Sequence, residues 1–493
     1  MNPSGNVGGR NSGTTNPSGN MGGRNSGNTN PTGMTNPSGN MGGRNSRNDN
    51  PVGNMGSRNS RNDNPGGGRG DLGGRNTRVF TNDRPVYRAQ GGERSSAGRD
   101  GGRIFEREGG LRIGTDRGGR VTTFERGGLK ASNFRADGHP GRIENSRPDG
   151  SRIVVERGFR GERRVDFVRP DRTRIVTNGN RGFVERPFQR GYVARTYVYG
   201  GRTDVRVYRE QTFGPIHYYR YVPRYYYQPT FYAWAGSSWV RPVAFGWGWM
   251  SSPWYGYYGG YFSPEPVYVS PALWLTDFVI AANLQADYEA RVAANGGVPP
   301  EGLSPDGSVA LSPEVKQQIA LEVRQQLAAE RAAAVQPGGD GFQPTGFEAP
   351  PDALDPRTKI FVVSSGIDLF ANDQTCSLTP GDIIERTSRD VTPDGQVPIS
   401  VTNSKDGDCP VDFAAMMDVS ALQDMHNAFR EQIASGMDQL AATQGRGLPA
   451  GPAASPRVVM AGTAQAAPDA RALLSIQNSE AEKVELQVKL PPL

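Results

Sequence analysis

The chain has 493 residues, a formal net charge of +6, and a hydrophobic content of 35%. Glycine and proline, with 66 and 38 residues, make up about a fifth of it, so only part of the chain can bury an apolar core. The longest nearly apolar stretch, residues 272–282, contains Thr276 and Asp277 and is too short for a transmembrane span.

The charge is divided unevenly between two halves that meet near residue 241. Residues 1–241 carry 41 basic and 20 acidic side chains, a net of +21, whereas residues 242–493 carry 15 basic and 30 acidic ones, a net of −15. The basic half therefore predicts contact with an acidic surface. That surface is either an external partner or the acidic half of the same chain.

Residues 1–77 form a repeat rich in Asn, Gly and Arg. The segment Asn2-Pro3-Ser4-Gly5 returns at Asn16-Pro17-Ser18-Gly19, and each unit has only about one Met or Val, which cannot offset the entropy of an ordered backbone. We expect a disordered tail. No basic and apolar leader follows Met1, so we expect export if a signal peptide lies upstream of the given start, and a cytoplasmic protein otherwise.

Residues 78–212 contain short β-prone runs that begin with Arg and end at Gly-rich or Asn-Gly turns. Alternation places Val165 and Phe167 on one face and Arg164 and Asp166 on the other, which leaves each strand a thin apolar face. We predict an elongated antiparallel meander of hairpins. Its repeated units resemble those of bacterial YD-type shell proteins, although the Tyr-Asp spacing is absent. The clearest predicted strands are residues 103–107, 120–124, 152–156, 164–168 and 174–177.

Residues 213–269 are rich in tyrosine and tryptophan, and the six prolines from Pro223 to Pro266 exclude a continuous helix. Large rings on an irregular backbone either fill a core or form an exposed binding surface, and the sequence leaves both interpretations open. The candidate binding residues in this segment are Tyr225, Tyr226, Tyr227, Trp247, Trp249, Trp254, Tyr257 and Tyr258.

Residues 270–335 predict two helices. Ser270-Pro271 and Ser312-Pro313 each supply an N-cap and a first-turn proline, for helices over about 271–295 and 313–334. Residues 336–356, rich in Gly, Pro and Asp, are expected to be a linker.

Residues 357–443 predict a compact domain of short strands followed by a helix. The runs 361–363, 378–384 and 399–401 resemble a bacterial SH3-like module, which implies a small β-barrel. Ser420 and Gln423 form a capping-box pattern for the helix. Cys376 and Cys409 lie in this domain, either as a disulfide or as two unrelated thiols. Residues 444–493 are expected to be a flexible tail.

No catalytic or metal constellation emerges from the sequence. The three histidines, His139, His217 and His426, are scattered without ligand spacing, so we predict no enzyme, no metal and no cofactor. His426 is expected to be structural. The fold class is predicted to be mixed and largely β.

The order of aromatic tract, helices and terminal barrel resembles uncharacterised bacterial envelope or secreted proteins, and that resemblance implies export. The main functional hypothesis is a non-catalytic envelope or surface protein that binds a cell-wall or surface polymer, a partner protein or itself. The alternative is nucleic-acid binding through arginine and interleaved aromatic rings. It is less favoured because nearby carboxylates, such as Glu106, Glu125 and Glu156, balance the arginines locally.

Overall fold

The chain divides into two units, residues 1–70 and 71–493, and the fold given below is that of the second. The predicted repeat tail over 1–77 and residues 336–348 of the predicted linker lie outside the described residues. The computed structural model describes residues 86–89, 93–98, 101–135, 138–158, 163–179, 181–189, 191–199, 202–300, 309–335, 349–371, 374–459 and 463–488.

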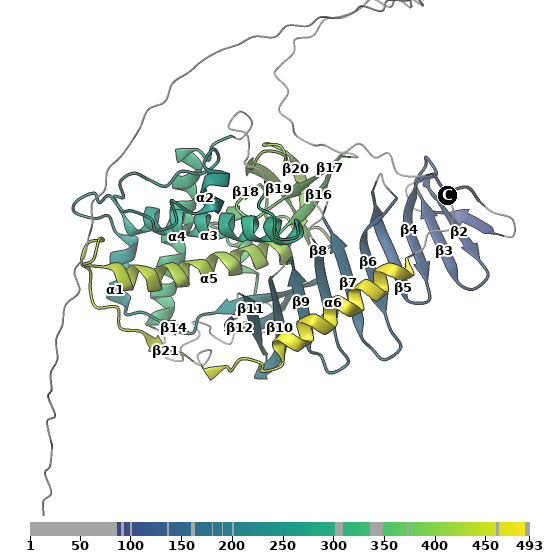
Figure 1. Ribbon diagram of the computed structural model, residues 1–493, viewed down its shortest axis with the longest axis horizontal. Helices are drawn as coiled ribbons and strands as arrows, with labels where there is room; N and C mark the ends of the chain where they lie inside the picture. The colour runs from purple at the N-terminus through teal and green to yellow at the C-terminus, as the bar shows by residue number, and fades with distance from the viewer. Residues whose placement is uncertain are drawn as a thin grey trace, which may run out of the picture. The chain divides into compact units, whose positions relative to one another are not determined.

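A large antiparallel sheet is built by successive hairpins, with every strand hydrogen-bonded to its neighbours in chain order (Figure 1). This is the succession of hairpins expected from the Gly-rich turns. Its thirteen strands are β1 (Arg94–Ala97), β2 (Arg103–Arg107), β3 (Leu111–Thr115), β4 (Val121–Arg126), β5 (Leu129–Phe134), β6 (Pro140–Ser146), β7 (Arg152–Arg157), β8 (Arg163–Val168), β9 (Arg174–Asn178), β10 (Arg181–Gln189), β11 (Tyr192–Tyr199), β12 (Arg202–Phe213) and β13 (Ile216–Val222).

One hairpin shows why the turns need glycine. Gly128 joins β4 to β5 with a φ of 83°, in the left-handed region that side chains rarely adopt. A Cβ added at this position would lie 2.4 Å from the carbonyl oxygen of Ser146. The Gly127-Gly128 pair therefore permits the tight return between these two strands.

The predicted irregular segment over 213–269 begins with a strand. The sheet runs ten residues past its predicted end at 212, to Val222, because residues 216–222 alternate polar and apolar side chains like the strands before them. Two prolines then begin short helices instead of only breaking structure, since Pro229 and Pro253 occupy first-turn positions. The elements are β14 (Tyr225–Tyr226), α1 (Pro229–Gly236) and α2 (Pro253–Tyr258).

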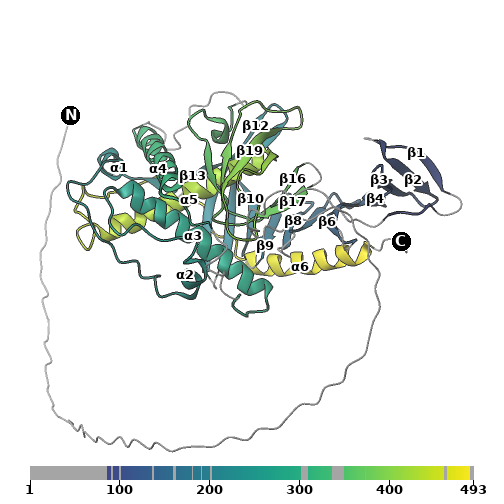
Figure 2. The same ribbon diagram turned by 90° about the horizontal axis from the view of Figure 1, so that it is seen from above.

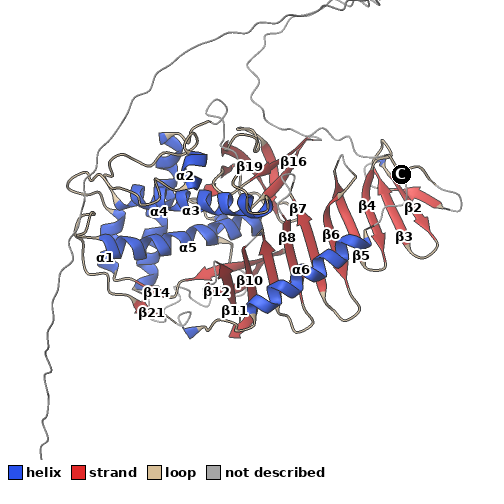
Figure 3. Ribbon diagram, in the orientation of Figure 1, coloured by secondary structure: helices blue, strands red, loops and turns tan. Residues whose placement is uncertain are grey.

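The two predicted helices are present as α3 (Pro271–Ala294) and α4 (Pro313–Ala334). The hydroxyls of Ser270 and Ser312 accept hydrogen bonds from the backbone N–H of Leu273 and Val315, at 3.4 and 3.3 Å. Both N-caps are therefore formed as the Ser-Pro pairs predicted. The two helices lie with α1, α2 and α5 (Val419–Thr443) in one group (Figure 3). Buried side chains of these helices contribute to the largest apolar core.

The C-terminal strands form two ladders. One is a four-stranded antiparallel sheet in the order β15-β18-β19-β20, and the other is the hairpin β16-β17. Residues 363–366, which follow the strand at the predicted run 361–363, separate the two ladders. The strands are β15 (Ile360–Val362), β16 (Ile367–Ala371), β17 (Gln374–Leu378), β18 (Ile383–Arg386), β19 (Gln396–Asn403) and β20 (Ala414–Asp418).

Helix α5 (Val419–Thr443) starts earlier than the predicted capping box. Its N-cap is Asp418, the last residue of β20, and Ser420 lies inside the first turn. The N–H of Val419 donates to the carbonyl oxygen of Gly395 at 3.0 Å. This loop carbonyl satisfies one of the N–H groups that have no partner inside the helix.

The prediction of a flexible tail over 444–493 is wrong for most of its length. Strand β21 (Arg457–Val458) pairs with β14, and helix α6 (Ala470–Gln487) lies across the sheet over β6–β11 (Figure 2). The Ala, Gly and Pro content of this segment does not indicate the helix. An apolar stripe at helical spacing, formed by Ala470, Leu473, Ala481 and Val484, packs on the sheet.

The two faces of the sheet differ. The apolar face carries the buried residues Ile153, Val155, Val165, Phe167 and Ile175, and α6 covers it. The opposite face carries the charged residues that alternate with them. No helix among the described residues combines the length and apolar composition that a bilayer crossing requires.

Candidate functional site

The aromatic residues predicted to bind a ligand lie mostly in the core. Tyr226, Tyr227, Trp247, Trp254 and Tyr258 are buried, so the exposed-surface interpretation is wrong for these five, and the core interpretation holds. The burial follows from packing between rings and helices. The Trp247 ring, for example, stacks on Trp274 of α3 with centroids 4.8 Å apart.

Three of the candidates are only partly buried. Tyr225, Trp249 and Tyr257 pack against the edge of the same core. The hydroxyl of Tyr225 donates to Asp438 of α5, and the Tyr257 ring lies 5.6 Å from that of Tyr288. Each of these three side chains thus also has a packing role inside the molecule.

Cys376 and Cys409 form a disulfide across 33 positions of sequence. Both residues are buried, and the N–H of Cys409 donates to the carbonyl oxygen of Ser377 at 2.9 Å. Closing a loop of this length stabilises the fold by about 3 to 4 kcal/mol in the chain-entropy account. The bond fixes the loop between β19 and β20 against β17.

The charged face of the sheet is a ladder of cross-strand ion pairs. Strand registry places Arg142 opposite Glu156, and Glu156 opposite Arg164. Arg152 reaches Glu144 with Nε and Oε1 2.7 Å apart. We define the charged face as Arg112, Arg142, Glu144, Arg152, Glu156, Arg164, Asp166, Arg174, Glu185 and Arg195.

The ladder shifts the acidity of its carboxylates. The hydrogen bond from Arg152 lowers the pKa of Glu144 below its ordinary value. At Asp166 burial acts to raise the pKa, but the Arg174 guanidinium outweighs it and the pKa is lowered. Both carboxylates therefore stay ionised at neutral pH and neutralise their arginines.

The ladder changes from exposed to buried along the sheet. Arg112 pairs with Glu106 at 3.0 Å, and both side chains are half exposed. Arg195 pairs with Glu185 at 2.6 Å, and both are buried. The Arg195 guanidinium also lies 4.0 Å from the centroid of the Tyr208 ring, in cation–π geometry.

A second set of arginines crosses from the basic half to the acidic half of the chain. Arg147 pairs with Glu480 of α6 at 2.7 Å, and Glu485 accepts from both Arg157 and Arg163. The charge asymmetry of the sequence therefore serves at least partly to dock the two halves on each other. We call these the docking pairs: Arg147–Glu480, Arg157–Glu485, Arg163–Glu485, Arg181–Glu289, Arg186–Asp469, Arg206–Glu431 and Arg220–Asp352.

A groove of about 910 Å³ lies between the charged face and the C-terminal strands. Strands β5–β9 and β13 form one wall, and residues 364–370, β20 and the start of α5 form the other. Phe370 and Met416 are 50% and 42% exposed on the second wall. We call this cavity the sheet groove. Its charged lining comprises Arg135, Arg142, Arg152, Arg157, Arg164 and Arg174 with Glu156, Asp166, Asp368, Asp418 and Asp424.

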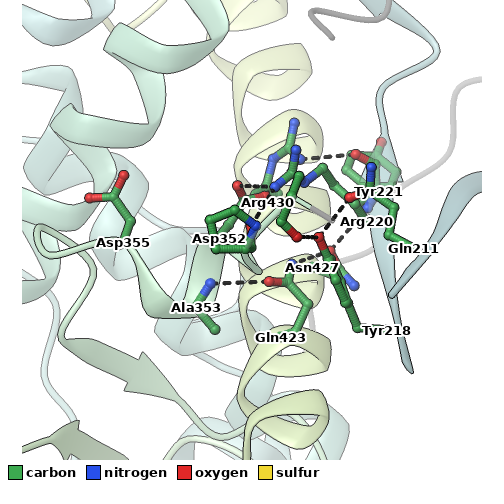
Figure 4. A network of polar contacts seen from close by, with 12 residues as sticks. Gln211, Tyr218, Arg220, Tyr221, Asp352, Ala353, Asp355, Gln423, Asn427 and Arg430 are labelled. Atoms are coloured by element: carbon green, nitrogen blue, oxygen red, sulfur yellow. Dashed lines mark hydrogen bonds and ion pairs between the residues drawn. The ribbon is translucent and has the colours of Figure 1, made fainter. Parts of the chain in front are cut away.

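Side chains of α5 hold the second wall against the sheet (Figure 4). The amide of Asn427 accepts from the N–H of Tyr221 at 3.0 Å and donates to the carbonyl oxygen of Tyr219 at 2.7 Å. It therefore bonds the backbone of the edge strand β13 as a neighbouring strand would. Gln423 donates to Asn427 at 3.1 Å and accepts from the N–H of Ala353 at 3.0 Å.

The same network joins the 3-10 turn η2 (Asp352–Leu354), inside the predicted linker over 336–356. Arg220 of β13 pairs with Asp352 at 2.9 Å, and Arg430 of α5 donates to the carbonyl oxygen of Tyr221 at 2.9 Å. The predicted linker is therefore fixed to the sheet in its last residues. These contacts fix the distance between the two walls of the sheet groove, because they join α5 and residue Asp352 to strand β13.

The histidines have separate environments. His217 lines the sheet groove, with its Nε2 2.7 Å from Oε1 of Glu210, and both side chains are about half exposed. His426 is buried on α5, and this burial lowers its pKa to about 4. Within the described residues no group of three or more His, Cys, Asp and Glu side chains is arranged to hold a metal ion.

The sequence alone does not predict the sheet groove. Its arginines and carboxylates were recognised as locally balanced, but their gathering depends on the docking of residues 364–425 on β5–β9. The alternation of Arg and Glu in residues 142–156 is the pattern in the sequence that indicates the charged wall of the groove.

Comparisons of this chain with protein-family models, curated proteins and solved structures found no match.

Proposed function

We propose that the protein is a non-catalytic, exported envelope or surface-associated protein that binds an extended polar polymer in the sheet groove. The groove itself is the observation that carries the proposal. Its volume of about 910 Å³ is enough for several residues of a chain molecule. Its lining combines paired charges with the exposed Phe370 and Met416.

The charge of the sheet groove favours a near-neutral ligand over nucleic acid. Six arginines and five carboxylates line it, a net of one positive charge. Phosphate chains bind proteins through cations that neutralise them, whereas Arg174 and Arg152 are already paired with Asp166 and Glu144. Hydroxyl-rich glycans instead accept and donate hydrogen bonds to such planar charged groups. A cell-wall glycan is the polymer we propose.

The disulfide supports export. Disulfides persist in oxidising compartments and are rare in the cytosol, and Cys376 and Cys409 are bonded in the buried interior of the C-terminal strands. Residues 357–443 resemble an SH3-like module. Small β folds of this class commonly serve as binding domains, which agrees with a binding role. The disulfide thus supports the exported location that we propose, and the resemblance supports the binding role.

The test is cosedimentation of the full chain with purified peptidoglycan sacculi. We expect the double variant Phe370→Ala/Met416→Ala to bind roughly tenfold more weakly, because it removes the apolar contact area of the groove. Val240→Ala/Met250→Ala, which truncates exposed side chains elsewhere, is the matched control and should bind like the parent.

Two outcomes would overturn the proposal. One is no sedimentation of the parent protein with sacculi above the level of a carrier protein. The other is an equal loss for the groove variant and its control. Salt-dependent binding of poly-uridylate, abolished by the groove variant, would favour the nucleic-acid alternative instead.

A further inference from the structure

A lysine and two aspartates are enclosed together between the C-terminal strands and the aromatic segment. The side chains of Lys405, Asp382 and Asp408 are each no more than 1% exposed. Asp382 follows the turn after β17, and Lys405 and Asp408 lie in the loop between β19 and β20. The Tyr261 ring lies over the ammonium group, 5.6 Å from its centroid.

The geometry directs the lysine nitrogen at one carboxyl group. Lys405 Nζ lies 2.6 Å from Asp382 Oδ1 and 3.4 Å from Asp408 Oδ2. The carbonyl oxygens of Thr379 and Pro380 accept from the same nitrogen at 3.2 and 3.0 Å. The nitrogen is therefore held in contact with one oxygen of the Asp382 carboxyl group, which keeps the two reacting groups together within one molecule.

Both carboxyl groups are fixed by other donors. Asp382 accepts from the N–H of Thr379 at 2.8 Å and from the N–H of Lys405 at 3.0 Å. Asp408 accepts from the hydroxyl of Thr379 at 2.7 Å. The three reacting side chains thus have little freedom to move apart.

The surroundings favour the protonated form of the Asp382 carboxyl group. Burial, and then the neighbouring Asp408, raise the pKa of Asp382 to about 7. Asp408, 3.4 Å from Lys405 Nζ, can take a proton from that nitrogen and leave the amine free to act as a nucleophile.

We propose that Lys405 and Asp382 become joined by an isopeptide bond. The Nζ–Cγ bond forms, the bond from Cγ to one carboxyl oxygen breaks, and that oxygen leaves as water with two protons from the ammonium group. Asp408 carries a proton from Nζ to the departing oxygen. No oxidant or other reactant is needed, because an ammonium and a carboxylate contain all the atoms of the amide and the water.

The isopeptide bond would crosslink the same two segments as the disulfide, the end of β17 with its following turn and the loop between β19 and β20. Cys376 and Cys409 join β17 to the loop that holds Asp408. A second covalent bond at the other end of the same turn and loop would restrain both segments against unfolding. This inference does not depend on the proposed ligand.

A second buried pair supplies an internal comparison. Lys316 Nζ lies 3.0 Å from Asp277 Oδ1, and the second carboxylate, Glu265, is 3.3 Å away but partly exposed. Water can reach that site and stabilise charged groups there. We therefore expect the bond at Lys405 and not at Lys316.

The test is the mass of the reduced and denatured full chain. We expect it to be lower than the sequence mass by one water molecule. After reduction and alkylation, trypsin should yield residues 360–386 covalently attached to residues 390–430, with no cleavage at Lys405. A full sequence mass, or a water loss that maps to Lys316 and Asp277, would overturn the assignment.

Variants separate the roles of the two aspartates. Asp382→Ala should restore the full mass, because the electrophile is gone. Asp382→Asn should lose one ammonia molecule and give the same linked peptide, because an amide can release ammonia where the acid releases water. Asp408→Asn should leave most of the chain unlinked. Linked peptide at the parent level in Asp408→Asn would contradict its role as proton carrier.

Discussion

The two faces of the thirteen-stranded sheet are stabilised by different forces. The apolar face is covered by α6 and loses its contact with water there. The charged face is a ladder of ion pairs whose environment changes from half exposed at Arg112–Glu106 to buried at Arg195–Glu185. The contribution of one sequence pattern to stability, arginine alternating with apolar residues, therefore depends on which segment packs on it.

The largest expected effect is at the buried end of the ladder. Arg195→Met leaves Glu185 buried without its partner, which should destabilise the protein by about 3 to 5 kcal/mol. Unfolding in urea, monitored by circular dichroism, measures the change. The double variant Arg195→Met/Glu185→Leu should recover most of the loss. If the single variant changed stability by less than the double, the buried ion pair would not be stabilising this face.

The apolar face is tested through α6. Leu473 is buried against the sheet, so Leu473→Ala should cost about 2 to 4 kcal/mol through lost burial and the cavity that remains. Ile476, half exposed on the same helix, is the matched control, and Ile476→Ala should change stability by less than about 0.5 kcal/mol. Equal effects of the two substitutions would mean that α6 does not cover the sheet in solution.

The free energy of unfolding should also depend on pH through His426 of α5, a helix that packs on the last strand of the sheet. Burial lowers the pKa of His426 to about 4, against about 6.5 in the unfolded chain. The unfolded state therefore binds more protons between these values, and stability should fall as pH drops from about 6.5 to 4, by about 3 kcal/mol in total.

The control for this pH dependence is His426→Gln, which cannot take up a proton. The variant should flatten the stability curve between about pH 6.5 and 4. An unchanged slope in the variant would assign the pH dependence to other groups.

The smallest effect is expected at the exposed end of the ladder. Arg112→Met removes a half-exposed pair and should change stability by no more than about 0.5 kcal/mol at moderate salt. Raising the salt concentration should remove what difference there is, because exposed charges are screened. A loss as large as that of Arg195→Met would remove the proposed distinction between the two ends.

The local patterns in the sequence predicted much of the fold. The strand at 103–107 has the predicted bounds, and the Ser-Pro pairs before α3 and α4 placed both helix starts. These features depend on neighbours in sequence, where alternation and capping act.

The features that the sequence did not predict depend on residues far apart. Burial of Tyr226 and Trp247 requires helices that follow tens of residues later. The apolar stripe of α6 has a helical period, but its stability comes from the sheet that it covers, and composition alone favoured a mobile tail. The sheet groove likewise exists only because β5–β9 and residues 364–425 meet.

The opposite charges of the two halves dock them on each other through pairs such as Arg147–Glu480 and Arg163–Glu485. A charge swap at Arg147 and Glu480 tests it most directly, because this pair joins the sheet to α6 at 2.7 Å. We predict that Arg147→Glu and Glu480→Arg each destabilise the protein and that the double variant recovers part of the loss, with a coupling of about 0.5 to 1 kcal/mol. If the stability losses of the two single variants simply added in the double variant, the charges of Arg147 and Glu480 would not dock the two halves.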